Sequence, residues 1–146
     1  MTKIFKQSIL VVTAMLFAGC ATTSPRDAEA RTLAMQTFGT NAYLKVLWFP
    51  TSYTESFTMT FLGDSGPQLQ IADAMEAAKD KREDLVFWCE GPKPSEATFA
   101  IKQALKYYVR NRLEQLNFLF VGDATEAENI RPLIESTGAK FYFHQN

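Results

Sequence analysis

The sequence predicts an α/β fold: one small domain with a mostly parallel β-sheet and helices on both faces of the sheet. Two patterns carry this prediction. Short apolar runs alternate with segments whose apolar residues recur at helical spacing. Several of these runs are apolar throughout, which is typical of strands in a parallel sheet that is covered on both faces. The predicted order of elements is β-β-α-β-α-β-α-β, with right-handed crossovers between parallel strands.

The first two strands are predicted at residues 43–49 (YLKVLWF) and 56–62 (SFTMTFL). The first run is almost continuously apolar. The second alternates strictly between apolar and polar side chains, which is typical of a strand buried on one face only. We therefore expect the second strand to pair with the first as a hairpin. It and the last strand suit the two edges of the sheet.

The first two helices of the domain are predicted from their start signals and apolar stripes. Gly66-Pro67 starts a helix to about Lys81, because proline is favoured at the first helical position. Ser95 is expected to cap a helix that runs to about Asn111. The stripes expected to face the core are Ile71, Ala72, Met75 and Ala78 in the first helix, and Ala97, Ile101, Ala104, Leu105 and Tyr108 in the second.

A third helix is predicted between Thr125 and Gly138. Thr125 and Glu128 have the spacing of a capping box, and glycine commonly ends a helix. Pro132 lies inside the segment and predicts a kink or a split, because proline lacks the N–H that the helix requires. The remaining strands are predicted at residues 85–89, 116–121 and 140–144.

The first twenty residues have the pattern of an export signal. Lys3 and Lys6 precede an apolar run at residues 9–17, which is far shorter than the about 20 residues that a bilayer-spanning helix needs. The segment ends in Leu16-Phe17-Ala18-Gly19-Cys20, which resembles the lipobox of bacterial lipoproteins. Phe17 departs from the aliphatic residue that is usual there. The resemblance implies that the signal is removed before Cys20 and that this residue is acylated.

The same resemblance implies a location. The residue after Cys20 is Ala21 rather than aspartate, which in enteric-type lipoproteins implies sorting to the outer membrane, facing the periplasm. The acyl chains would anchor the protein stably, since two chains suffice. The predicted organisation is a signal peptide at residues 1–19, a lipidated tether at 20–39 with a possible short helix, and a globular domain at 40–146.

The tether helix is predicted from Ser24 as N-cap and Pro25 at the first helical position. Its apolar face consists only of Leu33, Met35 and Phe38. We therefore expect this helix to fray or to dock loosely on the domain.

Charge and cysteine content exclude several classes of function. Without its signal the chain keeps thirteen basic and sixteen acidic residues, and no basic run stands out, so no nucleic acid partner is predicted. With Cys20 acylated, Cys89 is the only thiol, and it is interpreted as a small buried hydrophobic residue. One histidine and one free cysteine predict no metal site, and no cofactor motif is present.

The stretch 61–67 (FLGDSGP) raises a catalytic alternative. Trypsin-like proteases carry a similar serine loop, but their histidine precedes the serine, whereas His144 follows Ser65. The stretch also resembles the Gly-Asp-Ser block of SGNH esterases, whose base comes from an Asp-x-x-His; here Phe141 stands at the aspartate position. Ser65 and His144 are thus an alternative catalytic pair, and a strand-to-helix turn capped by Asp64 or Ser65 is the simpler interpretation.

Polar residues also follow three predicted strands, at 89–93, 122–125 and 144–146. Ligands of parallel sheets gather beyond the carboxyl ends of the strands, so these segments are expected to converge on one rim. The candidate binding residues of this rim are Glu90, Lys93, Asp123 and Thr125. Helix caps and turns are the simpler interpretation of the same residues.

Three further residues are candidates for protein contacts. Phe99 and Tyr107 lie off the apolar stripe of their helix, and exposed aromatic residues are favoured at interfaces. Thr58 lies in the alternating strand, which at a sheet edge can accept a strand of a partner.

These observations favour a non-enzymatic outer-membrane lipoprotein that binds an envelope protein, as an accessory factor of a secretion, pilus or conjugation apparatus. The choice of apparatus rests on what small lipoproteins often do. Two alternatives remain: a small esterase that uses Ser65 and His144, and a periplasmic binder of small molecules or peptidoglycan that uses the strand-end rim.

Overall fold

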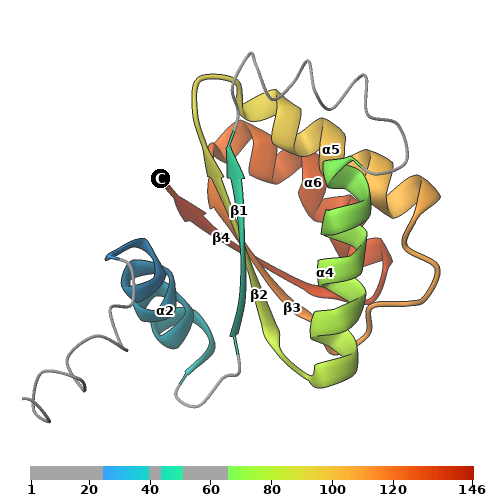
Figure 1. Cartoon of the computed structure of the whole chain (residues 1–146), viewed down its shortest axis with the longest axis horizontal. Coiled ribbons are helices and arrows are strands. Elements are labelled where there is room, and N and C mark those ends of the chain that lie inside the picture. Colours follow the sequence, from blue (N-terminus) through green and yellow to red (C-terminus); the bar gives the residue numbers. More distant parts are fainter. Residues whose placement is uncertain (1–24, 40–43, 51–65) are drawn as a thin grey trace, which may run out of the picture.

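The computed structural model describes residues 25–39, 44–50 and 66–146, and these form an α/β domain (Figure 1). The predicted fold class is confirmed. The elements are α2 (Pro25–Phe38), β1 (Leu44–Pro50), α4 (Pro67–Lys81), β2 (Asp84–Glu90), α5 (Pro94–Tyr107), β3 (Asn117–Gly122), α6 (Ala124–Ser136) and β4 (Lys140–Gln145).

The four described strands form one parallel sheet in the order β1-β2-β3-β4. Each strand therefore lies beside the next one along the chain. Because every crossover moves in the same direction along the sheet, and such crossovers are right-handed as a rule, α4, α5 and α6 are expected on one face of the sheet. Figure 1 shows these three helices on one side and α2 on the other.

The main core lies between the sheet and α4, α5 and α6. Phenyl rings stack across neighbouring strands, with Phe87 at the centre: its ring centroid lies 5.4 Å from that of Phe49 and 5.9 Å from that of Phe120. The predicted stripes of α4 and α5 pack on this layer, and their members Met75 and Ile101 are fully buried. The two central strands are buried along almost their whole length, as their continuous apolar runs predict.

The opposite face of the sheet is covered by α2. Ala30 and Ala34 are buried there, beside Trp88 of β2. The small alanine side chains let the helix approach the sheet closely, so α2 packs more tightly than its predicted apolar face suggests. Met35, counted in that face, is instead 55% exposed. The sheet is thus covered on both faces, as predicted.

Three helix starts differ from the prediction. Gly66 is the N-cap of α4, and among the described residues no side-chain hydrogen bond caps this helix, so the predicted cap by Asp64 or Ser65 is wrong. Lys93, not Ser95, is the N-cap of α5, because Pro94 already occupies the first helical position. Asp123, not Thr125, caps α6. The Asp123 carboxylate follows β3 directly and accepts hydrogen bonds from the Thr125 N–H at 2.9 Å and the Glu126 N–H at 3.2 Å.

The ends of these helices also differ. α5 ends at Tyr107, short of the predicted Asn111, whereas α6 is one continuous helix through Pro132, so the predicted split is wrong. Gly138 follows the end of α6 with a φ of +91°, which confirms its predicted role.

Several predictions fall outside the residues that the structure describes. These are the acylated Cys20, the Ser24 cap of the tether helix, the alternating strand with Thr58, and residues 61–65 with Ser65. Among the described helices, none combines the length and the apolar character that crossing a membrane demands.

Candidate functional site

The carboxyl ends of β2, β3 and β4 meet at one edge of the sheet, as the parallel topology predicts. They surround a hollow of about 230 Å³. Its lining consists of Cys89, Gly91, Pro94, Gly122, Asp123, Gln145 and Asn146. All three predicted polar segments therefore reach the same rim, and Asp123 is the one predicted binding residue that lines the hollow.

Hydrogen bonds tie the strand ends around this hollow together. The Asn146 side-chain amide donates to the Cys89 carbonyl at 3.2 Å, and the Asn146 N–H donates to the Gly122 carbonyl at 3.1 Å. Gly122 is required by space: a Cβ there would lie 3.0 Å from the Phe120 ring and 3.3 Å from the Cys89 Cβ. The floor of the hollow is therefore closely packed.

The other predicted rim residues already have partners. Glu90 forms an ion pair with Arg26 of α2 at 3.2 Å, and Lys93 forms one with Glu96 at 3.6 Å. Thr125 is exposed in the first turn of α6, where its N–H donates to Asp123. Glu90 and Lys93 thus have ion-pair partners, and Thr125 belongs to the capped start of α6.

Cys89 lies buried at this edge among carboxylates. Burial, with added effects of Glu126, Glu96 and Asp123, raises the pKa of the Cys89 thiol to about 11. The thiol is therefore protonated near neutral pH, and a protonated thiol is a poor nucleophile and a poor metal ligand. This agrees with its interpretation as a buried structural residue.

The same edge also holds the half-buried side chains of Glu96 and Glu126. The Thr98 hydroxyl donates to Glu126, which joins α5 to α6, whereas the Glu96 Oε2 is buried and accepts no hydrogen bond. The side chain of His144, the alternative base, is exposed, while its backbone belongs to the ladder between β3 and β4. Within the described ranges, no group of three or more His, Cys, Asp and Glu side chains is arranged to hold a metal ion.

The size of the strand-end hollow limits its use. At about 230 Å³ it is smaller than the roughly 300–1,000 Å³ of typical small-molecule sites. It suits at most a small polar ligand.

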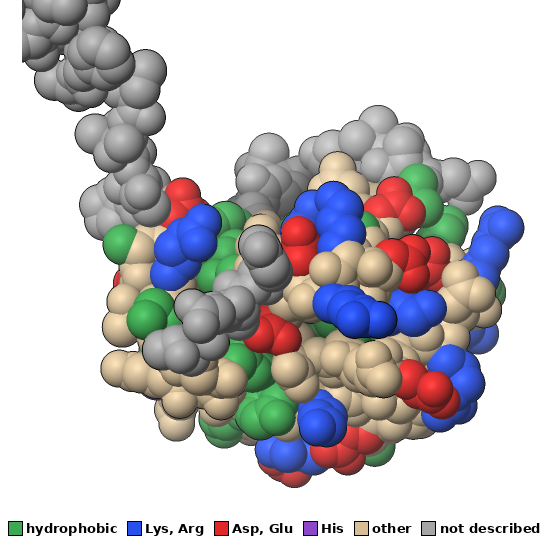
Figure 2. Space-filling model, turned by 90° about the horizontal axis from the view of Figure 1, so that it is seen from below, with side chains coloured by type: hydrophobic (Ala, Val, Ile, Leu, Met, Phe, Trp, Pro, Cys, Tyr) green, Lys and Arg blue, Asp and Glu red, His purple; other side chains and the backbone are tan. Residues whose placement is uncertain are grey.

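Charged side chains are mixed on the face that carries the amino ends of the strands. Figure 2, seen from below Figure 1, shows basic and acidic side chains interspersed there, with hydrophobic side chains between them. The described residues of this face form no broad positive surface of the kind that binds a phosphate backbone.

A second hollow lies between α5 and α6. Its volume is about 530 Å³, within the usual range of binding sites. Its lining consists of Lys102, Leu105 and Lys106 from α5, Asn129, Pro132, Leu133 and Ser136 from α6, and Thr137. We call this hollow the α5–α6 groove.

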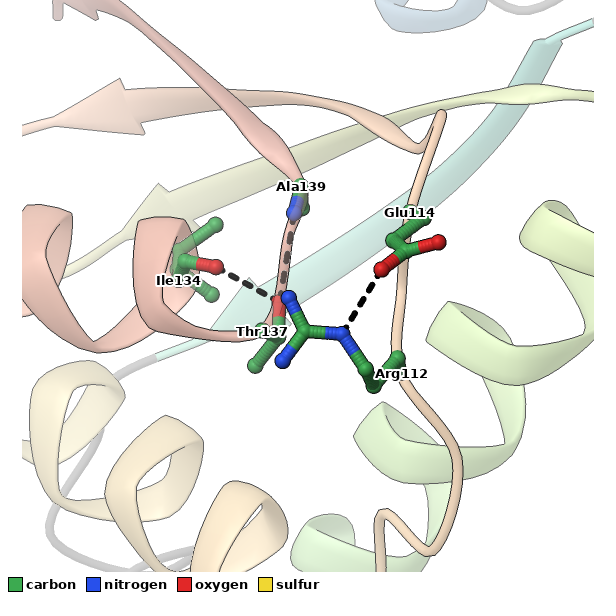
Figure 3. Close-up of polar contacts among 5 residues, drawn as sticks. All are labelled: Arg112, Glu114, Ile134, Thr137 and Ala139. Carbon is green, nitrogen blue, oxygen red and sulfur yellow. Dashed lines mark hydrogen bonds and ion pairs between the residues drawn. The ribbon is translucent and has the colours of Figure 1, made fainter.

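A turn beside the groove is held by local polar contacts (Figure 3). The Thr137 hydroxyl donates to the Ile134 carbonyl at 2.6 Å and accepts from the Ala139 N–H at 3.4 Å. Arg112 and Glu114, on the segment that precedes β3, form an ion pair at 2.8 Å next to this turn. The groove therefore has a well-defined end at Thr137.

The sequence predicted only part of this second surface. Phe99 and Tyr107 are 58% and 59% exposed, so their predicted position off the core stripe is confirmed. The α6 side of the groove was missed, because nothing in a single sequence reports the distance between two helices. Leu133, an apolar residue beside the buried stripe of α6, was the available signal.

Comparisons with known proteins leave the function to be argued from these surfaces. No family model matches the chain, and no match is found among curated proteins or solved structures.

Proposed function

We propose that this protein is a lipid-anchored, non-enzymatic binding protein of the outer membrane. It would act from the periplasmic face as an accessory factor of an envelope complex of the secretion, pilus or conjugation type. The observation that carries the binding role is the exposure of Phe99 on α5, one turn before Lys102 of the α5–α6 groove. An exposed aromatic residue next to a hollow is a common feature of protein contacts.

The anchoring half of the proposal rests on the sequence. Lys3 and Lys6, the apolar run at 9–17 and Ala18-Gly19-Cys20 together resemble a lipoprotein signal. Ala21 after the cysteine supports the outer membrane as the destination.

The non-enzymatic half is supported by the state of two reactive residues. The pKa of Cys89 is raised to about 11, and the side chain of His144 is exposed and has no described partner to orient it. An activated nucleophile requires an oriented base.

The alternative esterase makes an opposite prediction. A fluorophosphonate probe would label Ser65 covalently, and Ser65→Ala would abolish that labelling. We expect no labelling and full function of Ser65→Ala, with little change in stability, because Gly66 is the N-cap of α4 and, among the described residues, no side-chain hydrogen bond caps this helix. A binder of small molecules or peptidoglycan at the strand-end hollow is the weaker alternative, because that hollow is small and its charged neighbours are paired.

In-cell photocrosslinking tests the binding role. A photoreactive amino acid at Phe99 should give a discrete adduct with an envelope protein. The same amino acid at Gln36, exposed on α2 across the sheet, is the matched control and should give none. Cys20→Ser should lower the Phe99 adduct by removing the protein from the membrane. Identical adduct patterns at both positions would contradict a specific contact at α5.

A further inference from the structure

We propose that the α5–α6 groove is the docking site for an acidic amphipathic helix of the envelope partner. The apolar face of that helix would fill the groove, and its acidic side chains would pair with Lys102 and Lys106. This inference rests on the proposed function and names the surface and the partner chemistry for it.

The floor of the groove is apolar and incompletely covered. Leu105 is partly buried against the core, Leu133 is partly exposed, and Pro132 is exposed. A volume of about 530 Å³ leaves room for several large apolar side chains. An amphipathic helix supplies such side chains in a row, at spacings of three and four residues.

The shape of the groove suits a helix because its walls are two helices. α5 and α6 are successive crossovers of one parallel sheet, so they lie side by side and run in the same direction (Figure 1). The Thr98–Glu126 contact joins the two helices near their starts, and the turn at Thr137 defines the other end. A third helix laid along this pair contacts both walls.

The charges of the groove select the partner. Among the residues that the structure describes, its lining contains Lys102 and Lys106 and no acidic side chain. Neither lysine takes part in the described ion pairs, and the Lys106 ammonium lies 4.8 Å from the centre of the Tyr107 ring. The chain as a whole is slightly acidic, with a formal charge of −1, so this basic wall is a local feature.

The basic wall also predicts an orientation. Both lysines belong to α5, one turn apart, whereas the α6 wall presents the neutral Asn129 and Ser136. Acidic side chains of the partner would therefore face α5. Phe99 lies one turn before Lys102 on the same helix, where its exposed ring can pack on the docked segment.

The test places a photoreactive amino acid at Asn129 and, separately, at Ser136 in the full-length lipoprotein in its own cells. Both positions line the groove and are exposed, so the core stays unchanged. Mass spectrometry then identifies the crosslinked peptide. We expect one segment of one envelope protein, with helical apolar spacing and acidic flanks. A basic or extended segment, a second copy of this chain, or no adduct would overturn the inference.

A second experiment reverses the charges of the two groove lysines. Lys102→Glu combined with Lys106→Glu should reduce the adduct at Asn129 by about tenfold or more. The matched control, Lys81→Glu with Lys140→Glu, makes the same change of charge at exposed positions outside the groove. Its adduct yield at Asn129 should stay within about twofold of the unsubstituted protein. Changing the partner's acidic residues to lysine should restore the adduct in the reversed groove. An unchanged yield after reversal would overturn the inference.

The two proposals fail in different ways. An adduct at Phe99 with none at Asn129 or Ser136 would reject the groove and keep the binding function. Loss of adducts at all three positions, in a variant whose circular dichroism is unchanged, would reject both.

Discussion

At the scale of single residues, Cys89 shows how the surroundings of a thiol decide its chemistry. The sequence predicted a buried cysteine from its place in an apolar strand. The neighbouring carboxylates that raise its pKa could not be predicted, because Glu96, Asp123 and Glu126 come from segments that meet only in the folded chain.

We predict that Cys89 reacts slowly. In the Cys20→Ser form, where it is the only thiol, iodoacetamide at pH 8 should modify the folded protein roughly a hundredfold more slowly than the unfolded protein, because the thiolate fraction is that much lower. The measurement is the mass shift over time with and without urea. Equal rates in the two states would contradict the raised pKa.

The same shift predicts a pH dependence of stability. The thiol pKa is raised from 9.0 to about 11, so its contribution is fully present below pH 9 and is lost as the pH rises towards 11. Urea unfolding measures the free energy of unfolding at pH 8 and at pH 11. Between these two pH values it should fall less for Cys89→Ala than for the unsubstituted chain. A loss of the same size in both would refute this assignment.

Substitutions at two glycines distinguish the cost of backbone strain from the cost of a steric clash. Gly39 and Gly138 have almost the same φ, +92° and +91°, but a Cβ at Gly39 meets nothing within 4 Å, whereas one at Gly138 would lie 2.6 Å from the Glu114 Cγ. Gly39→Ala should cost about 1 kcal/mol of unfolding free energy from strain, and Gly138→Ala more, because Glu114 must also move. Chemical denaturation measures both, and equal losses would show that Glu114 moves freely.

At the scale of elements, α2 is the helix whose role changed most between sequence and structure. Its apolar stripe is built from Ala30 and Ala34, and alanines are easily overlooked beside larger apolar residues. By contrast, β2 and β3 were predicted almost to the residue, because continuous apolar runs between polar segments leave few alternatives.

Ala34→Glu should detach α2 from the sheet. The substitution places a charge without a partner in a contact that is 2% exposed, and we expect a loss of about 3 kcal/mol of unfolding free energy. Gln36→Glu, which adds the same charge at an exposed position of the same helix, should change stability by less than about 0.5 kcal/mol. Chemical denaturation of both variants measures this, and similar effects would mean that α2 contributes little.

At the scale of the whole molecule, the topology explains what sequence reasoning could reach. Parallel strands bring their carboxyl ends to one edge, so the meeting of three polar segments there follows from fold class alone. The α5–α6 groove depends on the spacing of two helices and on the side chains between them. That spacing is a property of packing and is not encoded in any local pattern.

For the whole molecule in the cell, the prediction concerns attachment to the membrane. Cys20→Ser should abolish incorporation of labelled palmitate and release the protein from the membrane fraction, because one thiol carries the attachment point. Fractionation and palmitate labelling measure the two effects. Equal palmitate in Cys20→Ser would refute lipidation at this residue.

The packing of α2 has a further consequence for an acylated protein. Only residues 21–24 would separate Cys20 from the first residue of a helix that is fixed to the sheet, which allows a reach of about 17 Å. The domain would therefore stay in a thin layer next to the bilayer and would not move through the whole depth of the periplasm. A partner on the same membrane would then meet it at an effective concentration of roughly millimolar, so a contact that is weak in dilute solution would still be largely occupied.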